Sequence, residues 1–162
     1  MRKIYLLPAI SFMMLLMASC RKRDALTADN YVVFESAAQG VTAAENSITV
    51  RLKLAIHASH EVPVTIDLTE TGVQYGVDYS TSPAAVSGKI QITVPAGSNE
   101  AVFTVNKNNS VLFDGDEQLT FDISSAASPV LIGVTRRFRL DFGEIVAANA
   151  SLTINGGGTL FP

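Results

Sequence analysis

Apolar and polar residues alternate along most of the chain between residues 31 and 142. The alternation runs from Ile48 to Ile56, from Val62 to Leu68 and from Ile90 to Val94. It returns in three later segments, which are Ala101–Val105, Leu119–Ile123 and Phe138–Phe142. A period of two points successive side chains to opposite faces, so each segment is expected to be a strand with one face in a core and one in water.

Taken with the short apolar run Tyr31–Phe34, which is assigned by composition alone, the pattern predicts seven strands. They lie near residues 31–35, 47–56, 62–69, 89–94, 100–106, 117–124 and 134–142. Glycine, proline and Asp-Gly breakers separate them, and helical periodicity is absent. The prediction is an all-β fold, an immunoglobulin-like antiparallel sandwich of two sheets with about seven strands. Its predicted core comprises Val50, Leu52, Leu54, Val64, Ile66, Ile92, Phe103, Leu119, Phe121 and Leu140.

The first 19 residues have a different character. Arg2 and Lys3 precede a long apolar run, and Ala18 and Ser19 lead into Cys20, which is the only cysteine in the chain. A basic start, an apolar segment and small residues before a cut are typical of a secretory signal. A cysteine at the first mature position is typical of a bacterial lipoprotein signal, in which the thiol receives a diacylglyceryl group before cleavage. The alternatives are an ordinary signal peptide with a bystander cysteine, or an uncleaved anchor.

These features predict four regions. Residues 1–19 are a lipoprotein signal peptide, residues 20–30 a lipidated tether, and residues 31–145 the sandwich. Residues 146–162 form a tail that carries the strand-like run Ser151–Ile154. That run either augments the sandwich or begins a second domain, and the second interpretation is preferred. The predicted location is the envelope of a Gram-negative bacterium, with the protein anchored by lipid in the outer membrane and facing the periplasm or the exterior.

Charge narrows the choice of partners. Without residues 1–19 the chain has 10 basic and 15 acidic residues, a formal charge of −5. Such a modestly acidic domain has no nucleic-acid footprint. The basic cluster Arg21-Lys22-Arg23 either contacts anionic lipid headgroups beside the anchor or is part of a solvated tether.

Catalytic motifs are not found in the sequence. It contains no nucleophile elbow and no glycine-rich phosphate loop. His57 and His60 lie between two predicted strands, and no further histidine or free cysteine completes a zinc site. We therefore interpret residues 57–61 as a polar turn and expect the protein not to be an enzyme.

One acidic segment stands out. Asp114, Asp116 and Glu117 lie within four residues at the start of a predicted strand, with Asn108 and Asn109 shortly before them. Glu45 precedes the 47–56 strand, and Asp78 lies in a Gly-Val-Asp-Tyr turn. Calcium prefers six to eight oxygen ligands of these kinds. The alternative is that Asp-Gly and Asn-Asn simply form turns with solvated carboxylates.

The order of these features resembles a Calx-beta domain over about residues 31–145. The resemblance rests on Val33-Phe34-Glu35, on Glu45, on Gly76–Tyr79, on the run from Ile92 to Gly97, on Asp114–Glu117 and on Leu131–Gly133. The resemblance implies an immunoglobulin-like sandwich. Several members of that family bind Ca²⁺ through loops at one end of the sandwich. By position, the implied calcium ligands are Glu45, Asp78, Asn108, Asn109, Asp114 and Glu117. Asn108 and Asn109 stand where the family usually has aspartates, which implies a weaker site.

Three functions are compared. The first is a lipid-anchored interaction or spacer module of Calx-beta type, weakly calcium-binding, with a protein or glycan partner. The second is a ligand-binding lipoprotein for glycan or haem, whose binding domain lies in or beyond the tail. A glycan site usually presents exposed aromatic rings, and the chain has no tryptophan, so the first function is preferred. The third, an envelope enzyme, has no supporting residue.

Overall fold

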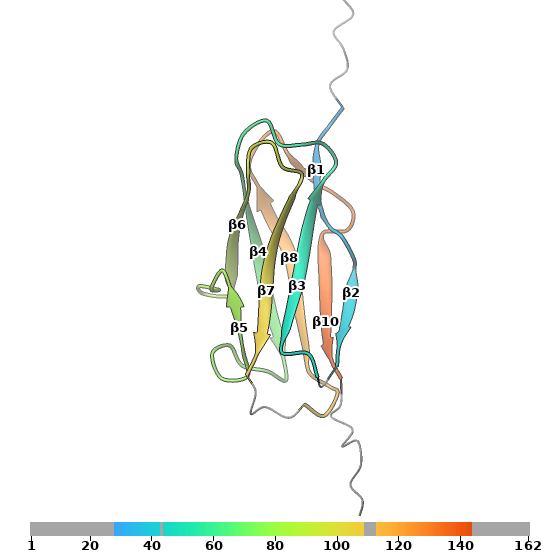
Figure 1. Ribbon diagram of the computed structural model, residues 1–162, viewed down its shortest axis with the longest axis vertical. Helices are drawn as coiled ribbons and strands as arrows, with labels where there is room; N and C mark the ends of the chain where they lie inside the picture. The colour runs from blue at the N-terminus through green and yellow to red at the C-terminus, as the bar shows by residue number, and fades with distance from the viewer. Residues whose placement is uncertain (1–27, 43, 109–112, 144–162) are drawn as a thin grey trace, which may run out of the picture.

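Ten strands form two five-stranded sheets that pack face to face in the computed structural model (Figure 1). The structure describes residues 28–42, 44–108 and 113–143, and Cys20 lies outside these ranges. The strands are β1 (Tyr31–Phe34), β2 (Ala38–Val41), β3 (Ser47–Leu54), β4 (Val62–Thr71), β5 (Tyr79–Ser82), β6 (Lys89–Val94), β7 (Glu100–Lys107), β8 (Gln118–Ala126), β9 (Leu131–Ile132) and β10 (Arg137–Phe142). All of the secondary structure in the described ranges is strand, which confirms the predicted all-β sandwich.

The strand order is β5-β7-β3-β1-β9 in one sheet and β2-β10-β8-β4-β6 in the other. The inner pairs are antiparallel, as predicted. At one side of the sandwich, however, β9 pairs with β1 and β2 pairs with β10 in parallel. The parallel pairs arise because β1 and β2 follow each other along the chain but belong to different sheets, so the first strand crosses from one layer to the other.

All seven predicted strands are present, with small differences at their ends. The three additional strands, β2, β5 and β9, lie at sheet edges and are short. They have only two to four residues, which is too short for a run of alternating apolar and polar residues to be recognised.

The core lies between the two sheets and contains every predicted core residue. All ten are at most 6% exposed to solvent. Four phenylalanines form a connected chain across the layers, with ring centroids of Phe34 and Phe138 5.7 Å apart, Phe138 and Phe121 6.0 Å apart, and Phe121 and Phe103 5.1 Å apart. Because Phe34 and Phe103 belong to one sheet and the other two to the second, this chain joins the sheets.

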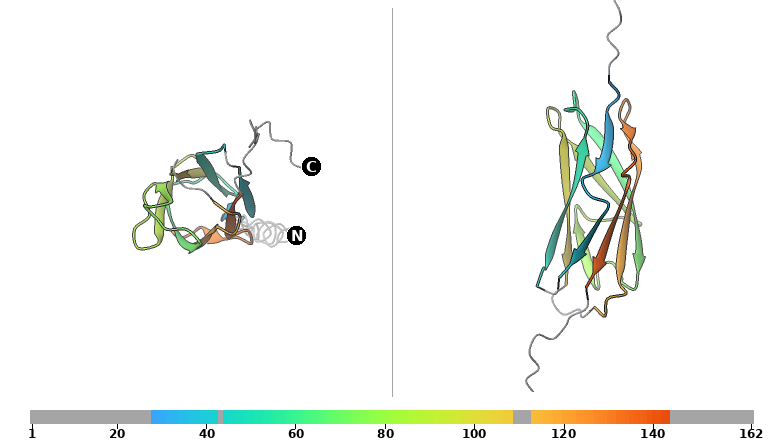
Figure 2. Two further views of the ribbon diagram at one scale, coloured as in Figure 1. Left: turned by 90° about the horizontal axis from the view of Figure 1, so that it is seen from below. Right: turned by 90° about the vertical axis from the view of Figure 1, so that its right-hand side faces the viewer.

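The chain enters the sandwich at one end of its long axis and leaves at the other (Figures 1 and 2). β1 starts at the first end, where the turns 55–61, 95–99 and 127–130 also lie. β10 runs parallel to β2 and ends at the opposite end, beside the loop residues 44–46, 72–78 and 113–117. We call these the entry end and the exit end.

None of the secondary structure in the described ranges is a helix long and apolar enough to cross a bilayer.

Gly133 explains how closely β9 lies against β1. A Cβ atom added to this glycine would lie 2.4 Å from Cγ1 of Val33 and 3.5 Å from Cβ of Tyr31. We expect Gly133→Ala to lower the free energy of unfolding by about 1–3 kcal/mol, as for other overpacked sites. Because Val33→Ala removes the clashing methyl group, the double variant should lose less than the sum of the single variants, as urea unfolding can measure. Strict additivity would contradict the predicted clash.

Tyr79 links the two sheets through a partly buried hydrogen bond. Its side chain is fully buried, and its hydroxyl donates to Oε1 of Glu70 at 2.6 Å. Burial, reinforced by the carboxylate of Glu70, raises the pKa of Tyr79 above its ordinary value of 10. The neutral phenol is therefore favoured in the folded state, and its contribution to stability is complete below pH 10 and lost as the pH rises above it.

Tyr79→Phe should accordingly lower the free energy of unfolding by about 1–2 kcal/mol near pH 8. Above pH 10 this difference should shrink, because only the wild-type protein must keep Tyr79 protonated in order to stay folded. Urea unfolding of both proteins at the two pH values checks the prediction. A difference that stays constant with pH would contradict the assignment.

Candidate functional site

The predicted calcium ligands lie in three loops at the exit end. Glu45 is in the loop between β2 and β3, and Asp78 is in the loop between β4 and β5. Asn108, Asp114 and Glu117 belong to the connection between β7 and β8. Asn109 lies outside the described residues. The sandwich topology therefore brings the described members of the set to the same end of the molecule, although they are divided among three loops (Figure 1).

Glu117 and Asp114 shape the loop that precedes β8. The Glu117 carboxylate accepts hydrogen bonds from the N–H of Asp114 at 3.2 Å and of Gly115 at 3.0 Å. The Asp114 carboxylate accepts one from the N–H of Asp116 at 3.2 Å. Gly115 takes a positive φ of 107°, a conformation that suits glycine. Two carboxylates therefore satisfy three backbone donors within four residues and hold the turn.

Glu45 has a similar local role before β3. Its Oε2 accepts hydrogen bonds from the backbone N–H and from the hydroxyl of Thr42, both at 2.9 Å. The backbone hydrogen bond, followed by the hydroxyl, lowers the pKa of Glu45 below its ordinary value. The carboxylate is therefore held in its charged form.

Asp78 and Asn108 connect the loop between β4 and β5 with the residue that follows β7. The Asp78 carboxylate accepts the N–H of Gln74 at 2.7 Å, and its carbonyl accepts the N–H of Asn108 at 2.9 Å. The side-chain amide of Asn108 donates to the carbonyl of Val77. The end of β7 is thus fixed against the loop that leads into β5.

The arrangement supplies oxygen ligands but does not gather them. Within the described residues, no group of three or more histidine, cysteine, aspartate or glutamate side chains is close enough to hold a metal ion. Each carboxylate instead bonds to the backbone of its own loop. A calcium ion needs six to eight oxygens around it, so the loops would have to move together to form a site from these side chains.

Sequence reasoning treated these carboxylates as ligands and missed their capping role. The signal for it is the spacing Thr42-x-x-Glu45 and Asp114-x-x-Glu117. In a capping box, an acidic side chain reaches back over three residues to a free backbone N–H. Both glutamates accept a backbone hydrogen bond over this interval.

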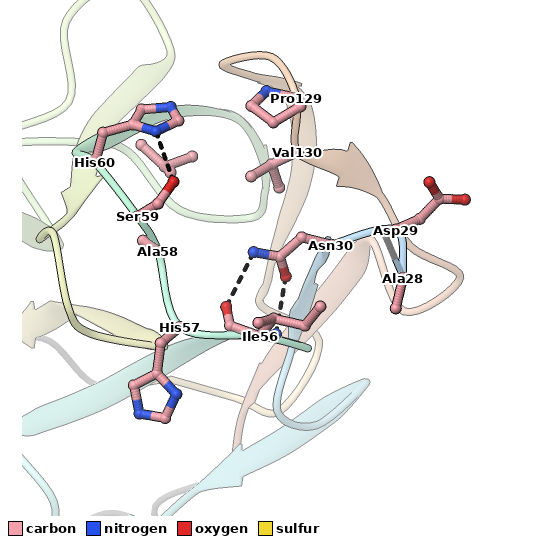
Figure 3. Close-up of a pocket in the computed structure, with 11 residues that line it drawn as sticks. Ala28, Asp29, Asn30, Ile56, His57, Ala58, Ser59, His60, Pro129 and Val130 are labelled. Carbon is pink, nitrogen blue, oxygen red and sulfur yellow. Dashed lines mark hydrogen bonds between the residues drawn. The ribbon is translucent and has the colours of Figure 1, made fainter. Parts of the chain in front are cut away.

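A pocket of about 380 Å³ opens at the entry end (Figure 3). The amide of Asn30 crosses its floor, donating to the carbonyl of Ile56 and accepting the Ile56 N–H, both at 2.9 Å. His60 Nδ1 lies 3.0 Å from the hydroxyl of Ser59, and the ring of His57 points in a different direction from that of His60. The two imidazoles therefore do not converge on one point, which agrees with the interpretation of residues 57–61 as a polar turn.

A second cavity, of about 550 Å³, lies beyond the end of β5. Here residues 100–103 of β7 pair with β3 on one side and, within the described ranges, have no strand neighbour on the other. Ser98 covers part of this edge, because its hydroxyl accepts the N–H of Glu100 at 3.1 Å and donates to the Glu100 carbonyl at 3.0 Å. Satisfying edge groups in this way blunts a free strand edge.

Among known proteins, similarity to this chain is found at the level of the fold. No family model matches the chain, and no curated protein is significantly similar to it. Among solved structures, the apo-form Calx CBD1 domain superimposes with a TM-score of 0.58 at 17% identity, over 71% of this chain and 96% of that domain. The Calx CBD2 domain gives a TM-score of 0.57 at 9% identity, over 72% of this chain and 88% of that domain. The fold is Calx-beta-like.

A third structure, the calcium binding domain CBD12 of CALX1.1, gives a TM-score of 0.56 at 18% identity. The match covers 69% of this chain and 43% of that structure. At such identities the similarity establishes the architecture of this Calx-beta-like chain and not its ligands.

Proposed function

We propose that this chain is a lipid-anchored spacer and interaction module of the cell envelope. In this proposal, acyl chains on Cys20 hold the entry end near the membrane, and the exit end points away from it. The observation that carries the proposal is the path of the chain, which enters the Calx-beta-like sandwich at one end and leaves at the other (Figure 2). A domain with this path adds its whole length between an anchor and whatever follows or binds at the far end.

The anchor is supported by the sequence alone. Arg2, Lys3, the apolar run and Ala18-Ser19 precede the single cysteine in the order of a lipoprotein signal. Two or more acyl chains give stable attachment, whereas one chain gives only marginal binding. The proposed location is the outer membrane of a Gram-negative bacterium.

The interaction role is supported by the loops and the charged sheet faces of the sandwich. Its loops are held by their own side chains, and its sheet faces carry paired charges, such as Lys53 with Glu100 at 2.6 Å and Arg137 with Asp122 at 2.7 Å. We propose that the protein is not an enzyme and that it binds a protein or glycan partner.

Analysis of the mature N-terminus tests the proposed anchor. The protein is extracted from membranes and digested, and its first peptide is examined by mass spectrometry. We expect that peptide to begin at Cys20 and to carry acyl groups. An unmodified thiol at Cys20, or a chain that still begins at Met1, would overturn the proposal.

Calcium is the ligand that we propose for the exit end. The proposal is supported by the acidic loops described above and by the name of the similar CBD12 structure, a calcium binding domain. The residues proposed to hold it are Glu45, Asp78, Asn108, Asp114 and Glu117, together with Asn109. Hard carboxylate and amide oxygens are the chemistry that calcium prefers.

We expect millimolar Ca²⁺ to raise the melting temperature, because an ion that binds only the folded state stabilises it by mass action. With an affinity of ~10⁻⁴–10⁻³ M, typical of weak extracellular modules, the rise should be on the order of 5 °C. The double variant Asp114→Asn, Glu117→Gln should lose this rise and still fold, since the new amides keep one acceptor oxygen each.

The matched control removes two carboxylates from the entry end, in the variant Asp29→Asn, Glu61→Gln. This control should keep the calcium-dependent rise. A wild-type melting temperature that does not respond to millimolar Ca²⁺, while responding normally to general salt, would leave the exit-end carboxylates as loop caps alone.

A further inference from the structure

Exposed apolar side chains gather near the entry end. In the described ranges, eight large hydrophobic residues are exposed, and five of them lie at the entry end or along the adjoining side of β1. We call these five the entry patch: Tyr31, Ile56, Leu131, Ile132 and Val134, which are 39%, 43%, 48%, 36% and 100% exposed. Of the other three, Val77 lies in the loop before β5, Val86 lies between β5 and β6, and Val102 lies in β7.

Strand pairing and one side-chain amide place the members of the entry patch near β1. β9 lies parallel to β1, with Tyr31 opposite Leu131 and Val32 opposite Ile132. Val134 follows directly after Gly133, whose N–H donates to the carbonyl of Val32 at 2.9 Å. The backbone of Ile56 is held by the side-chain amide of Asn30, the residue before Tyr31 (Figure 3).

The fold itself gives no reason for this composition. β9 is the outermost strand of its sheet, and edge strands usually carry charges that discourage contact with other molecules. Here the edge carries leucine, isoleucine and a fully exposed valine. Exposed apolar side chains that gather along one sheet edge are typical of an interaction site.

Two basic residues follow the patch along the chain. Arg136 and Arg137 follow Val134 closely, and their side chains are 62% and 65% exposed. Both reach Asp122, at 3.7 Å and 2.7 Å, with the guanidinium groups still open to solvent. Tyr31 adds an aromatic ring with a polar hydroxyl, which donates to Asp29 at 3.2 Å. Apolar side chains, an amphipathic aromatic ring and neighbouring arginines are the combination that suits a membrane interface.

We propose that the entry patch rests on the surface of the bilayer in which the protein is anchored. This inference depends on the proposed acylation of Cys20. Seven residues lie between Cys20 and Ala28, the first described residue, so the eight steps of a fully extended chain span at most about 29 Å. The patch is thus kept close to the lipid, and a tethered surface meets its target at high effective concentration. The contact orients the sandwich and turns the exit end outward.

Site-specific fluorescence tests this contact. Cys20 is the only cysteine and its thiol is occupied when acylated, so Val134→Cys introduces a single reactive thiol for a polarity-sensitive dye. The matched control is Val77→Cys, which places the same dye on an exposed valine at the exit end. Each full-length acylated protein is reconstituted into vesicles of phosphatidylcholine and phosphatidylglycerol that contain a lipid-borne quencher.

The expected result is a blue-shifted emission and a loss of fluorescence through the lipid-borne quencher at position 134, with neither change at position 77. A third variant, Leu131→Cys, should behave like Val134→Cys, which excludes an effect peculiar to one site. Vesicle-bound protein with equal, unquenched emission at positions 134 and 77 would overturn the membrane contact and leave the anchor intact. A blue shift without quenching would overturn it in favour of a protein partner or a second copy. Failure of the acylated protein to bind vesicles at all would instead overturn the proposed anchor.

Discussion

Replacing Phe121 with alanine is expected to lower the free energy of unfolding by about 3–5 kcal/mol, as for other buried aromatic residues. Phe121 is fully buried in β8, and its ring lies 5.1 Å from Phe103 and 6.0 Å from Phe138. Truncation leaves a cavity where one sheet meets the other. Because sheets are closely packed, the neighbouring rings can fill this space only in part.

Urea unfolding of the wild-type protein and of the variant measures this loss. Val86→Ala is the control, because Val86 is 72% exposed and its truncation should change stability by less than about 0.5 kcal/mol. A loss at Phe121 no larger than at Val86 would contradict the position of the core. Far-UV circular dichroism of the wild-type domain should show strand and little helix.

The alternating pattern determined how much of the fold could be predicted. Where a strand has one face in the core and one in water, every second residue must be apolar, so β3, β4, β6, β7, β8 and β10 were recognisable from sequence. The same alternation identified the inward faces, and residues such as Leu52 and Ile66 are buried as expected.

The short edge strands β2, β5 and β9 could not be predicted in this way. β2 consists of Ala38-Gln39-Gly40-Val41, in which only Val41 is buried, and β9 contains only two residues. Their pairing depends on the passage of the chain from one sheet to the other between Phe34 and Ala38. No sequence pattern in this short segment indicates that passage. For this reason the parallel pairs were missed as well.

The sequence predicted that the acidic loops share one end of the sandwich, but it did not predict the hydrogen bonds of their carboxylates. The order of acidic residues along the chain indicated loops that share one end of a sandwich, and the described loops lie there. Which donor each carboxylate bonds to depends on the loop conformation. Thr42 and Glu45, or Asp114 and Glu117, satisfy each other locally, and the sequence shows this only if their three-residue spacing is read as a capping pattern.

Cys20→Ala is expected to release the protein from the membrane. The thiol is the proposed site of the acyl chains, and without them only the tether's basic cluster and the entry patch would face the bilayer, which together give weak attachment. The sandwich should remain folded, because its buried core residues lie between Val32 and Phe142. Equal urea midpoints of the purified domains would verify this.

Fractionation of cells that express the wild-type protein, Cys20→Ala, or the tether control Thr27→Ala, each with acyl labelling, tests the lipid-anchored module most directly. We expect the wild-type and Thr27→Ala proteins to carry the acyl label and to be found in the membrane fraction. The Cys20→Ala protein should carry no label and should be absent from the membrane fraction. A Cys20→Ala protein that stays in the membrane at the wild-type level, with no acyl label on either protein, would contradict the account.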